Sequence, residues 1–295
     1  MTLPSLLFDV TLIVALLLLC GLLGIVGVDR LRGFRPHLLD RVRLVFPYLV
    51  LLGVVLALNS LLREVGPDLS WIIGWRITGW IASLEGTFVA TVQSHSNPVF
   101  TTYFSYVYIY GYVFLLAFPI LAYFVLPDTR PIRETAIAYS LNYAIGVVCY
   151  VLFIAYGPRN VMPDLVDQLL YTHWPESQLL TSEVNSNVNV FPSLHTSLAV
   201  TVAALAYRTR EAYPTWLPIA TVLALSVVIS TMYLGIHWGI DVLAGIGLAA
   251  ISVAAAVWLT DPERRDGRLG RVGRRLRRLV DWPVERLLQA VRSRS

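Results

Sequence analysis

Two short segments of the sequence carry side chains that could act together in nucleophilic catalysis. His237 and Asp241 lie four residues apart, and His195 closes the segment Phe191-Pro192-Ser193-Leu194-His195. If residues 237–241 are helical, the Asp241 carboxylate shares a face with His237, can hold one ring nitrogen and leaves the other free to attack. A second imidazole, when protonated, can deliver a proton to a leaving group. These residue types predict group-transfer chemistry that uses two histidines.

The segment before His195 indicates that the transferred group contains phosphorus. Proline followed by serine is typical of a helix start, and Ser193 would cap a helix that begins at Leu194. Free backbone N–H groups at such a helix end, together with the helix dipole, favour an anion. A phosphate there would lie beside His195, whose protonation the same helix end disfavours until the phosphate dianion binds.

The elements that position these residues belong to a membrane protein. The chain is 56% hydrophobic and 14% charged, and its mean hydropathy is +0.65, all outside the range of ordinary soluble domains. A bilayer core needs about 20 apolar residues per helix. The sequence therefore predicts an all-α bundle of about seven transmembrane helices, at Leu6–Val28, Leu44–Leu62, Tyr103–Leu126, Thr135–Tyr156, Leu194–Tyr207, Pro214–Ile236 and Gly239–Thr260.

The arginines predict the orientation of the bundle. The chain has no lysine, and the segments that follow the odd-numbered spans hold 20 of its arginines. The opposite side holds Arg63, Arg76 and Arg159. The positive-inside rule then places the N-terminus outside and the C-terminus in the cytoplasm, with both histidine motifs on the extracytoplasmic side of the cell membrane. The tryptophan-rich stretch 71–93 is interrupted by charges and glycines, and we expect it to be a helix lying in the interface.

These expectations divide the chain into three parts. Residues 1–43 form an extra transmembrane helix and a basic cytoplasmic loop, and residues 44–260 form a six-helix catalytic domain that includes the interfacial helix 71–93. Residues 261–295 form an Arg-rich cytoplasmic tail. The tail is either solvated or held by anionic membrane lipids, and no nucleic-acid partner is predicted.

The two histidine motifs resemble signatures of the type 2 phosphatidic acid phosphatase superfamily. Pro192-Ser193-Leu194-His195 is similar to that family's Pro-Ser-Gly-His, and Ser230-Thr231-x5-His237-x3-Asp241 is similar to its Ser-Arg-x5-His-x3-Asp. The leucine and the missing arginine look like the branch that contains inositol phosphorylceramide synthase, an inositolphosphotransferase, where Phe-Pro-Ser-Leu-His also occurs. The resemblance covers roughly residues 103–260.

The resemblance implies roles for individual residues. His237 would be the nucleophile, Asp241 its partner, His195 the general acid and Ser193 a phosphate contact. The family's first signature, Lys-x6-Arg-Pro, cannot occur in a chain without lysine. Arg159 stands nearest to it and is either a phosphate ligand, through its bidentate fork, or an interfacial anchor, with Arg76 in reserve.

Several functions remain open on the sequence alone. If a polyol or a lipid alcohol accepts the group from a lipid phosphate or phosphodiester, the protein is a membrane lipid phosphotransferase; if water accepts it, the protein is a lipid phosphate phosphatase. Neither reaction needs a metal or a cofactor. The alternatives from other classes are a haem or metal protein that uses the same histidines as ligands and a transporter with a His/Asp proton relay.

Overall fold

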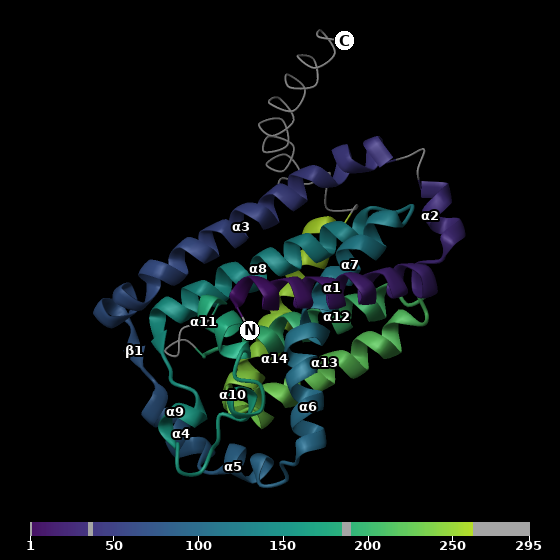
Figure 1. Ribbon diagram of the computed structural model, residues 1–295. Helices are drawn as coiled ribbons and strands as arrows, with labels where there is room; N and C mark the ends of the chain where they lie inside the picture. Colours follow the sequence, from purple (N-terminus) through teal and green to yellow (C-terminus); the bar gives the residue numbers. More distant parts are fainter. Residues whose placement is uncertain (1, 35–37, 185–189, 262–295) are drawn as a thin grey trace.

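The protein is an all-α bundle of membrane-spanning helices (Figure 1). The computed structural model describes residues 2–34, 38–184 and 190–261, so the predicted Arg-rich tail lies, apart from its first residue, outside the described part. Within that part, six helical segments are long and apolar enough to cross a membrane: Leu3–Val26, Leu38–Leu62, Pro98–Val125, Arg130–Leu152, Trp216–Tyr233 and Gly239–Thr260. They confirm the predicted fold class.

The predicted span at Leu194–Tyr207, which is not among these six, forms the short helix α12 (Leu194–Arg208). The other helices surround it. It packs against α7 (Tyr112–Val125), α8 (Arg130–Leu152), α13 (Trp216–Tyr233) and α14 (Gly239–Thr260). Its 15 residues cover about 22 Å, and small buried residues such as Ala199 and Ala206 permit close packing. Because α12 is shorter than α8, α13 and α14, its N-terminus can lie below the end of the bundle.

The remaining long helices cover the outside of this group. Helix α3 (Leu38–Ile73) runs along α8, and α1 (Leu3–Gly21), continued by the π-helical turn η1 (Leu22–Val26), packs on α7 (Figure 1). Helix α2 (Val28–Phe34) follows η1. Helix α6 (Pro98–Tyr106) continues through a second π-helical turn, η3 (Val107–Gly111), into α7.

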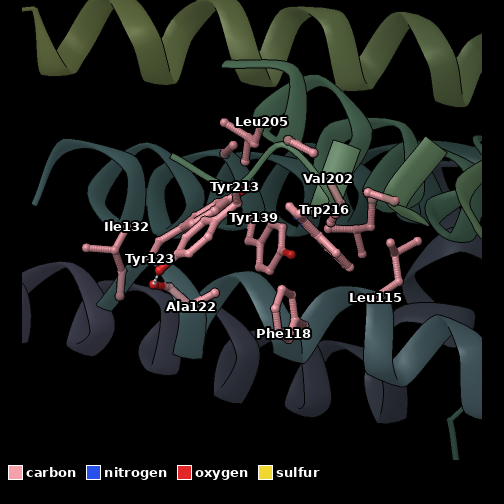
Figure 2. Close-up of a cluster of buried hydrophobic side chains, with 14 of the residues drawn as sticks. Leu115, Phe118, Ala122, Tyr123, Ile132, Tyr139, Val202, Leu205, Tyr213 and Trp216 are labelled. Atoms are coloured by element: carbon pink, nitrogen blue, oxygen red, sulfur yellow. Dashed lines mark hydrogen bonds between the residues drawn. The ribbon is translucent and has the colours of Figure 1, made fainter. Parts of the chain in front are cut away.

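Aromatic rings and buried hydrogen bonds hold the core together (Figure 2). The rings of Phe118 and Trp216 have centroids 4.4 Å apart, and the Tyr213 hydroxyl donates to the Ala122 carbonyl at 2.7 Å. Between α8 and α12, Asn142 hydrogen-bonds both Ser197 and Thr201. Lipid tails are as apolar as leucine, so close packing and interhelical polar contacts of this kind specify which helices associate in a membrane.

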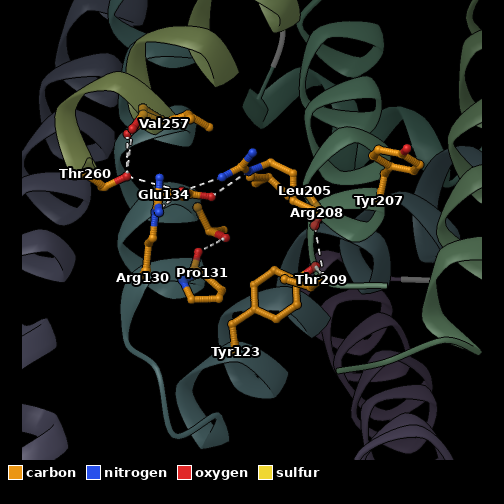
Figure 3. Close-up of polar contacts among 12 residues, drawn as sticks. Tyr123, Arg130, Pro131, Glu134, Leu205, Tyr207, Arg208, Thr209, Val257 and Thr260 are labelled. Carbon is orange, nitrogen blue, oxygen red and sulfur yellow. Dashed lines mark hydrogen bonds and ion pairs between the residues drawn. The ribbon is translucent and has the colours of Figure 1, made fainter. Parts of the chain in front are cut away.

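A buried carboxylate joins three helices at the end of the bundle opposite the histidine motifs (Figure 3). Glu134, near the start of α8, is 3% exposed and accepts from Arg208 of α12 at 2.9 Å and from Arg130 at 2.8 Å. The Thr260 hydroxyl, at the end of α14, donates to the same carboxylate at 3.3 Å. This ionic cluster fixes the ends of α8, α12 and α14 relative to one another.

The structure corrects the expected interfacial helix at 71–93. Helix α3 passes through Pro67 and ends at Ile73, and the segment then forms β1 (Trp75–Arg76), α4 (Thr78–Glu85) and α5 (Phe88–Gln93). Two glycines explain the breaks. A Cβ on Gly74 would lie 2.5 Å from the Ser70 carbonyl oxygen, and Gly86 has φ +59°, which favours glycine.

The short elements gather at the end of the bundle that carries the histidine motifs (Figure 1). Strand β1 pairs in parallel with β2 (Phe153–Ile154), which directly follows α8. Helices α9 (Pro158–Val161), α10 (Leu169–His173) and α11 (Ser177–Val184) follow in the connection to α12. The chain thus returns several times to the end of the bundle where α12 and α14 begin.

Candidate active site

His237 and Asp241 are paired and buried, although not by the predicted helical spacing. Helix α14 begins at Gly239, so His237 precedes it. Asp241 lies in the first turn, and its Oδ2 accepts from the Trp238 amide at 2.9 Å. The same Oδ2 lies 3.4 Å from His237 Nδ1, within ion-pair distance but without a hydrogen bond. The prediction of a pair is therefore confirmed, and the shared helical face is wrong.

The backbone fixes the position of His237 from two sides. Gly235 has φ +70° and makes the turn between α13 and α14 possible. The His237 amide then donates to the Thr231 carbonyl at 3.0 Å. Because Nδ1 faces Asp241, Nε2 is the ring nitrogen that remains for chemistry.

Ser193 caps α12 as predicted and also joins the two motifs. Its Oγ accepts from the Thr196 amide at 3.3 Å, and its own amide donates to the Asp241 carbonyl at 3.0 Å. Gly245 of α14 permits this approach, since a Cβ there would lie 2.6 Å from the Ser193 carbonyl oxygen. The N-termini of α12 and α14 are therefore held directly against each other.

His195 faces His237 and lies between two tyrosines. The two imidazole centroids are 6.5 Å apart. Tyr108 stacks on His195 with a centroid distance of 4.5 Å and an interplanar angle of 21°, and Tyr112 contacts it at 4.3 Å. These contacts hold the ring in place at the start of α12, and the His195 amide makes no hydrogen bond to a described residue.

Arg159 is buried next to the His237 turn. The side chain is 5% exposed, and its backbone amide donates to the Gly235 carbonyl at 3.2 Å. The guanidinium lies over the Tyr171 ring at 4.7 Å and donates from Nη2 to the Tyr171 hydroxyl at 3.3 Å. Nη1 is buried and has no partner among the described residues. A buried cationic nitrogen without a partner is costly unless an anion completes it.

Arg76 does not join these residues by any contact in the described part of the chain. It is exposed on β1, and its guanidinium lies over the Trp71 ring at 4.9 Å. At the position of the missing signature arginine, the Thr231 hydroxyl donates to the Val228 carbonyl at 2.7 Å and so remains within its own helix. Arg159 is thus the arginine that the structure brings to the His237 turn.

Three further residues complete the site and were not predicted. Glu85, at the end of α4, accepts from the amides of Gly239 and Ile240 at 2.7 and 2.9 Å. These bonds occupy the N-terminus of α14, so an anion has access to α12 instead. The other two are Tyr108 and Tyr112, and the alternation of tyrosine in the sequence from 106 to 112 is the signal that could have revealed them.

Histidine and carboxylate side chains are also potential metal ligands. Within residues 2–34, 38–184 and 190–261, no three histidine, cysteine, aspartate or glutamate side chains come together in a way that could hold a metal ion. The chemistry available from these residues is that of two imidazoles, a carboxylate and a guanidinium.

The chain has apolar helices of membrane-spanning length, and the buried His237 faces His195 at one end of the bundle. These features put the chain among integral membrane proteins with a polar site at the end of the bundle. Within that class the family can be named. Residues 79–255, more than half of the chain, match the PAP2 superfamily, and the chain belongs to it. No curated protein and no solved structure matches the chain. Membership makes the protein a lipid enzyme of the general phosphatase or phosphotransferase type.

Proposed function

We propose that the protein is a lipid phosphotransferase that works through a phosphohistidine on His237. It takes a phosphoryl or phosphorylated headgroup from a lipid phosphate or phosphodiester and passes it to a polyol or a lipid alcohol. The observation that carries the proposal is the opposition of His195 and His237. The ring centroids are 6.5 Å apart, so the two imidazoles can act on the same phosphoryl group, one on phosphorus and the other on the leaving oxygen.

The first half of the reaction forms the covalent intermediate. The lone pair on His237 Nε2 attacks phosphorus, the bond from phosphorus to the leaving oxygen breaks, and His195 gives its proton to that oxygen. Asp241 stabilises the positive charge that develops on His237, since its Oδ2 lies 3.4 Å from Nδ1. In the second half, His195 takes the proton of the acceptor hydroxyl, whose oxygen attacks phosphorus and releases His237.

Two positive groups bind the phosphate in this proposal. Arg159 presents Nη1, which has no partner among the described residues, and a guanidinium matches the geometry of phosphate oxygens. The first turn of α12, with Ser193 as its cap, offers backbone amides and the positive end of the helix dipole. A bound phosphate dianion also favours the protonated form of His195 that the first step requires.

The choice of acceptor separates transfer from hydrolysis. The segment Phe191–His195 resembles that of inositol phosphorylceramide synthase, and this resemblance supports transfer to an alcohol. With water as the acceptor, the same residues would make the protein a lipid phosphate phosphatase. We also place the site on the extracytoplasmic side of the cell membrane, with the N-terminus outside and the C-terminus in the cytoplasm, because the arginines concentrate in the opposite loops.

The test is an activity assay on purified protein in detergent. Radiolabelled lipid phosphates and phosphoinositides are supplied with and without polyol and lipid-alcohol acceptors, and both free phosphate and new lipid are followed. We expect new lipid that depends on the acceptor. If free phosphate is the only product, the protein is a phosphatase and not a transferase. If no substrate gives a product, both proposed activities are refuted.

Variants test the assigned roles. His237→Ala should abolish the acid-labile phosphoenzyme, and His95→Ala is the matched control because His95 is exposed and bonds only to its own segment. Asp241→Asn should retain substrate binding and slow turnover, by about 10²-fold or more if it acts as an orienting partner. A labelled phosphoenzyme in His237→Ala would refute the nucleophile.

A further inference from the structure

A pocket of about 410 Å³ lies between helix α1 and the catalytic bundle. Its volume falls within the range of about 300–1,000 Å³ that is typical of ligand sites. The family match begins at residue 79, so α1 lies outside it and forms one wall, while the bundle supplies the other. The lining residues are Leu6, Asp9, Leu12, Ile13, Tyr106, Tyr110, His173 and Trp174.

Three aromatic rings in this pocket contact one another. Trp174 lies 5.9 Å from Tyr106 with an interplanar angle of 84°, and 5.7 Å from Tyr110 with an angle of 30°. The two tyrosine rings are 5.6 Å apart at 65°. All three rings line the pocket, and their planes are set at different angles. The electron-rich faces of tyrosine and tryptophan attract cations.

Asp9 adds a negative charge to the aromatic pocket. It lies within the apolar run of α1, where an ionisable side chain is costly unless it has a partner. In the described part of the chain, no residue makes an ion pair or hydrogen bond with its carboxylate, and the pocket lining contains no arginine. The Nε2 atom of His173 is already engaged by the Thr102 hydroxyl at 2.9 Å. The carboxylate is therefore available to a bound cation.

The π-helical turn η3 separates this pocket from the active site. Residues four apart lie on one face of a helical turn, and residues two apart lie on opposite faces. Tyr106 and Tyr110 accordingly contact Trp174, whereas Tyr108 and Tyr112 contact His195. The alternating tyrosines therefore contribute to two different sites, the pocket beside α1 and the surroundings of His195. The pocket is distinct from the histidine pair.

We infer that Asp9, Tyr106, Tyr110 and Trp174 form a binding site for a quaternary ammonium group. A primary ammonium has three N–H donors that need acceptors, and the aromatic walls offer few. A quaternary ammonium has no donors and gains from aromatic faces and a nearby carboxylate. Two sources of this group fit: a free choline-type compound and the headgroup of a choline lipid.

The first experiment measures binding without turnover. Purified protein in a maltoside detergent is titrated with choline and with the neutral isostere in which carbon replaces the nitrogen. A second arm offers choline lipid or an anionic glycerol lipid and detects the bound lipid by native mass spectrometry. We expect saturable binding of choline but not of the isostere. Tighter retention of the choline lipid would identify a lipid headgroup as the source, and binding of choline alone would identify a free compound.

Variants distinguish a specific cation site from nonspecific binding to a hydrophobic surface. Asp9→Asn and Trp174→Leu should each weaken choline binding by about 2- to 30-fold, the range expected for the loss of one cation–π or ionic contact. Trp174→Phe should restore part of it. Trp75→Leu is the control, because Trp75 is 73% exposed on β1 and outside the pocket. Equal binding of choline and its isostere, or undiminished binding by Asp9→Asn, would overturn the inference.

The result does not depend on the proposed reaction. His237→Ala should bind choline as the unaltered protein does, because His237 is not part of the pocket lining. Loss of choline binding in that variant would place the cation in the active site and would also overturn the inference. Failure to find transferase activity would leave this measurement intact.

Discussion

Gly245→Ala tests whether the spacing of α12 and α14 sets the rate of the reaction. A Cβ at this position would lie 2.6 Å from the Ser193 carbonyl oxygen and 3.1 Å from the Cβ of Thr196. Ordinary contact begins at 3.4 Å, so the start of α12 must move by about 0.8 Å. The atom that is struck belongs to the backbone and cannot rotate away as a side-chain end would.

This displacement carries Ser193 and His195 away from His237 and Asp241. A misplacement of about 1 Å in a catalytic group can cost about 10²-fold in rate. For a shift of about 0.8 Å, we expect kcat to fall between about 10- and 100-fold. The amide of Ser193, now 3.0 Å from the Asp241 carbonyl oxygen, should also lose that hydrogen bond.

The assay is acceptor-dependent formation of new lipid, with thermal unfolding in detergent measured in parallel. Gly247→Ala is the matched control, because Gly247 lies in the same helix and a Cβ there meets nothing within 4 Å. Both substitutions gain the same helix propensity, up to about 1 kcal/mol. The control should therefore keep full activity and unfold at the same or a slightly higher temperature.

Either of two results would refute the reasoning about helix spacing. One is full activity in Gly245→Ala, which would mean that the helices adjust without disturbing the histidines. The other is an equal loss of activity in Gly247→Ala, which would point to the backbone flexibility of α14 rather than to its contact with α12.

Three further substitutions probe separate parts of the structure. Arg159→Lys keeps the charge but loses the planar fork, so KM should rise about tenfold with a smaller change in kcat; an unchanged KM would remove Arg159 from the phosphate site. Tyr108→Leu removes the ring stacked on His195 and should lower kcat about tenfold while Tyr108→Phe retains it, and equal rates in both would show that stacking is unimportant. Glu134→Gln leaves Arg208 without its carboxylate and should cost about 1–3 kcal/mol in denaturation experiments with little effect on kcat, whereas unchanged stability would contradict a structural role for the cluster.

The sequence predicted the class of fold because hydropathy reports directly on membrane-spanning helices. The predicted second span and the observed one both end at Leu62, but the helix that contains the span, α3, continues to Ile73. Pro67 and the charges that precede it are normally signs of a helix end. Helix α3 packs along α8, so tertiary contact outweighed those local signals.

The motifs predicted the pairing of the two histidines, but they could not predict what surrounds them. Tyr108 and Tyr112 contact His195, but they lie in an apolar span, where aromatic residues are ordinarily interpreted as part of the hydrophobic core. Their contacts with His195 depend on the π-helical turn η3, and no single residue in the sequence predicts such a turn. In the sequence, Glu85 only interrupts the expected interfacial helix, because its contact with α14 spans more than 150 positions.

The hydrogen bond between Ser193 and Asp241 runs from main chain to main chain. Substituting either side chain therefore leaves both of its atoms in place, and the two motifs can stay in register while their chemistry changes. In this chain that bond holds the start of α12 against α14, and His195 faces His237.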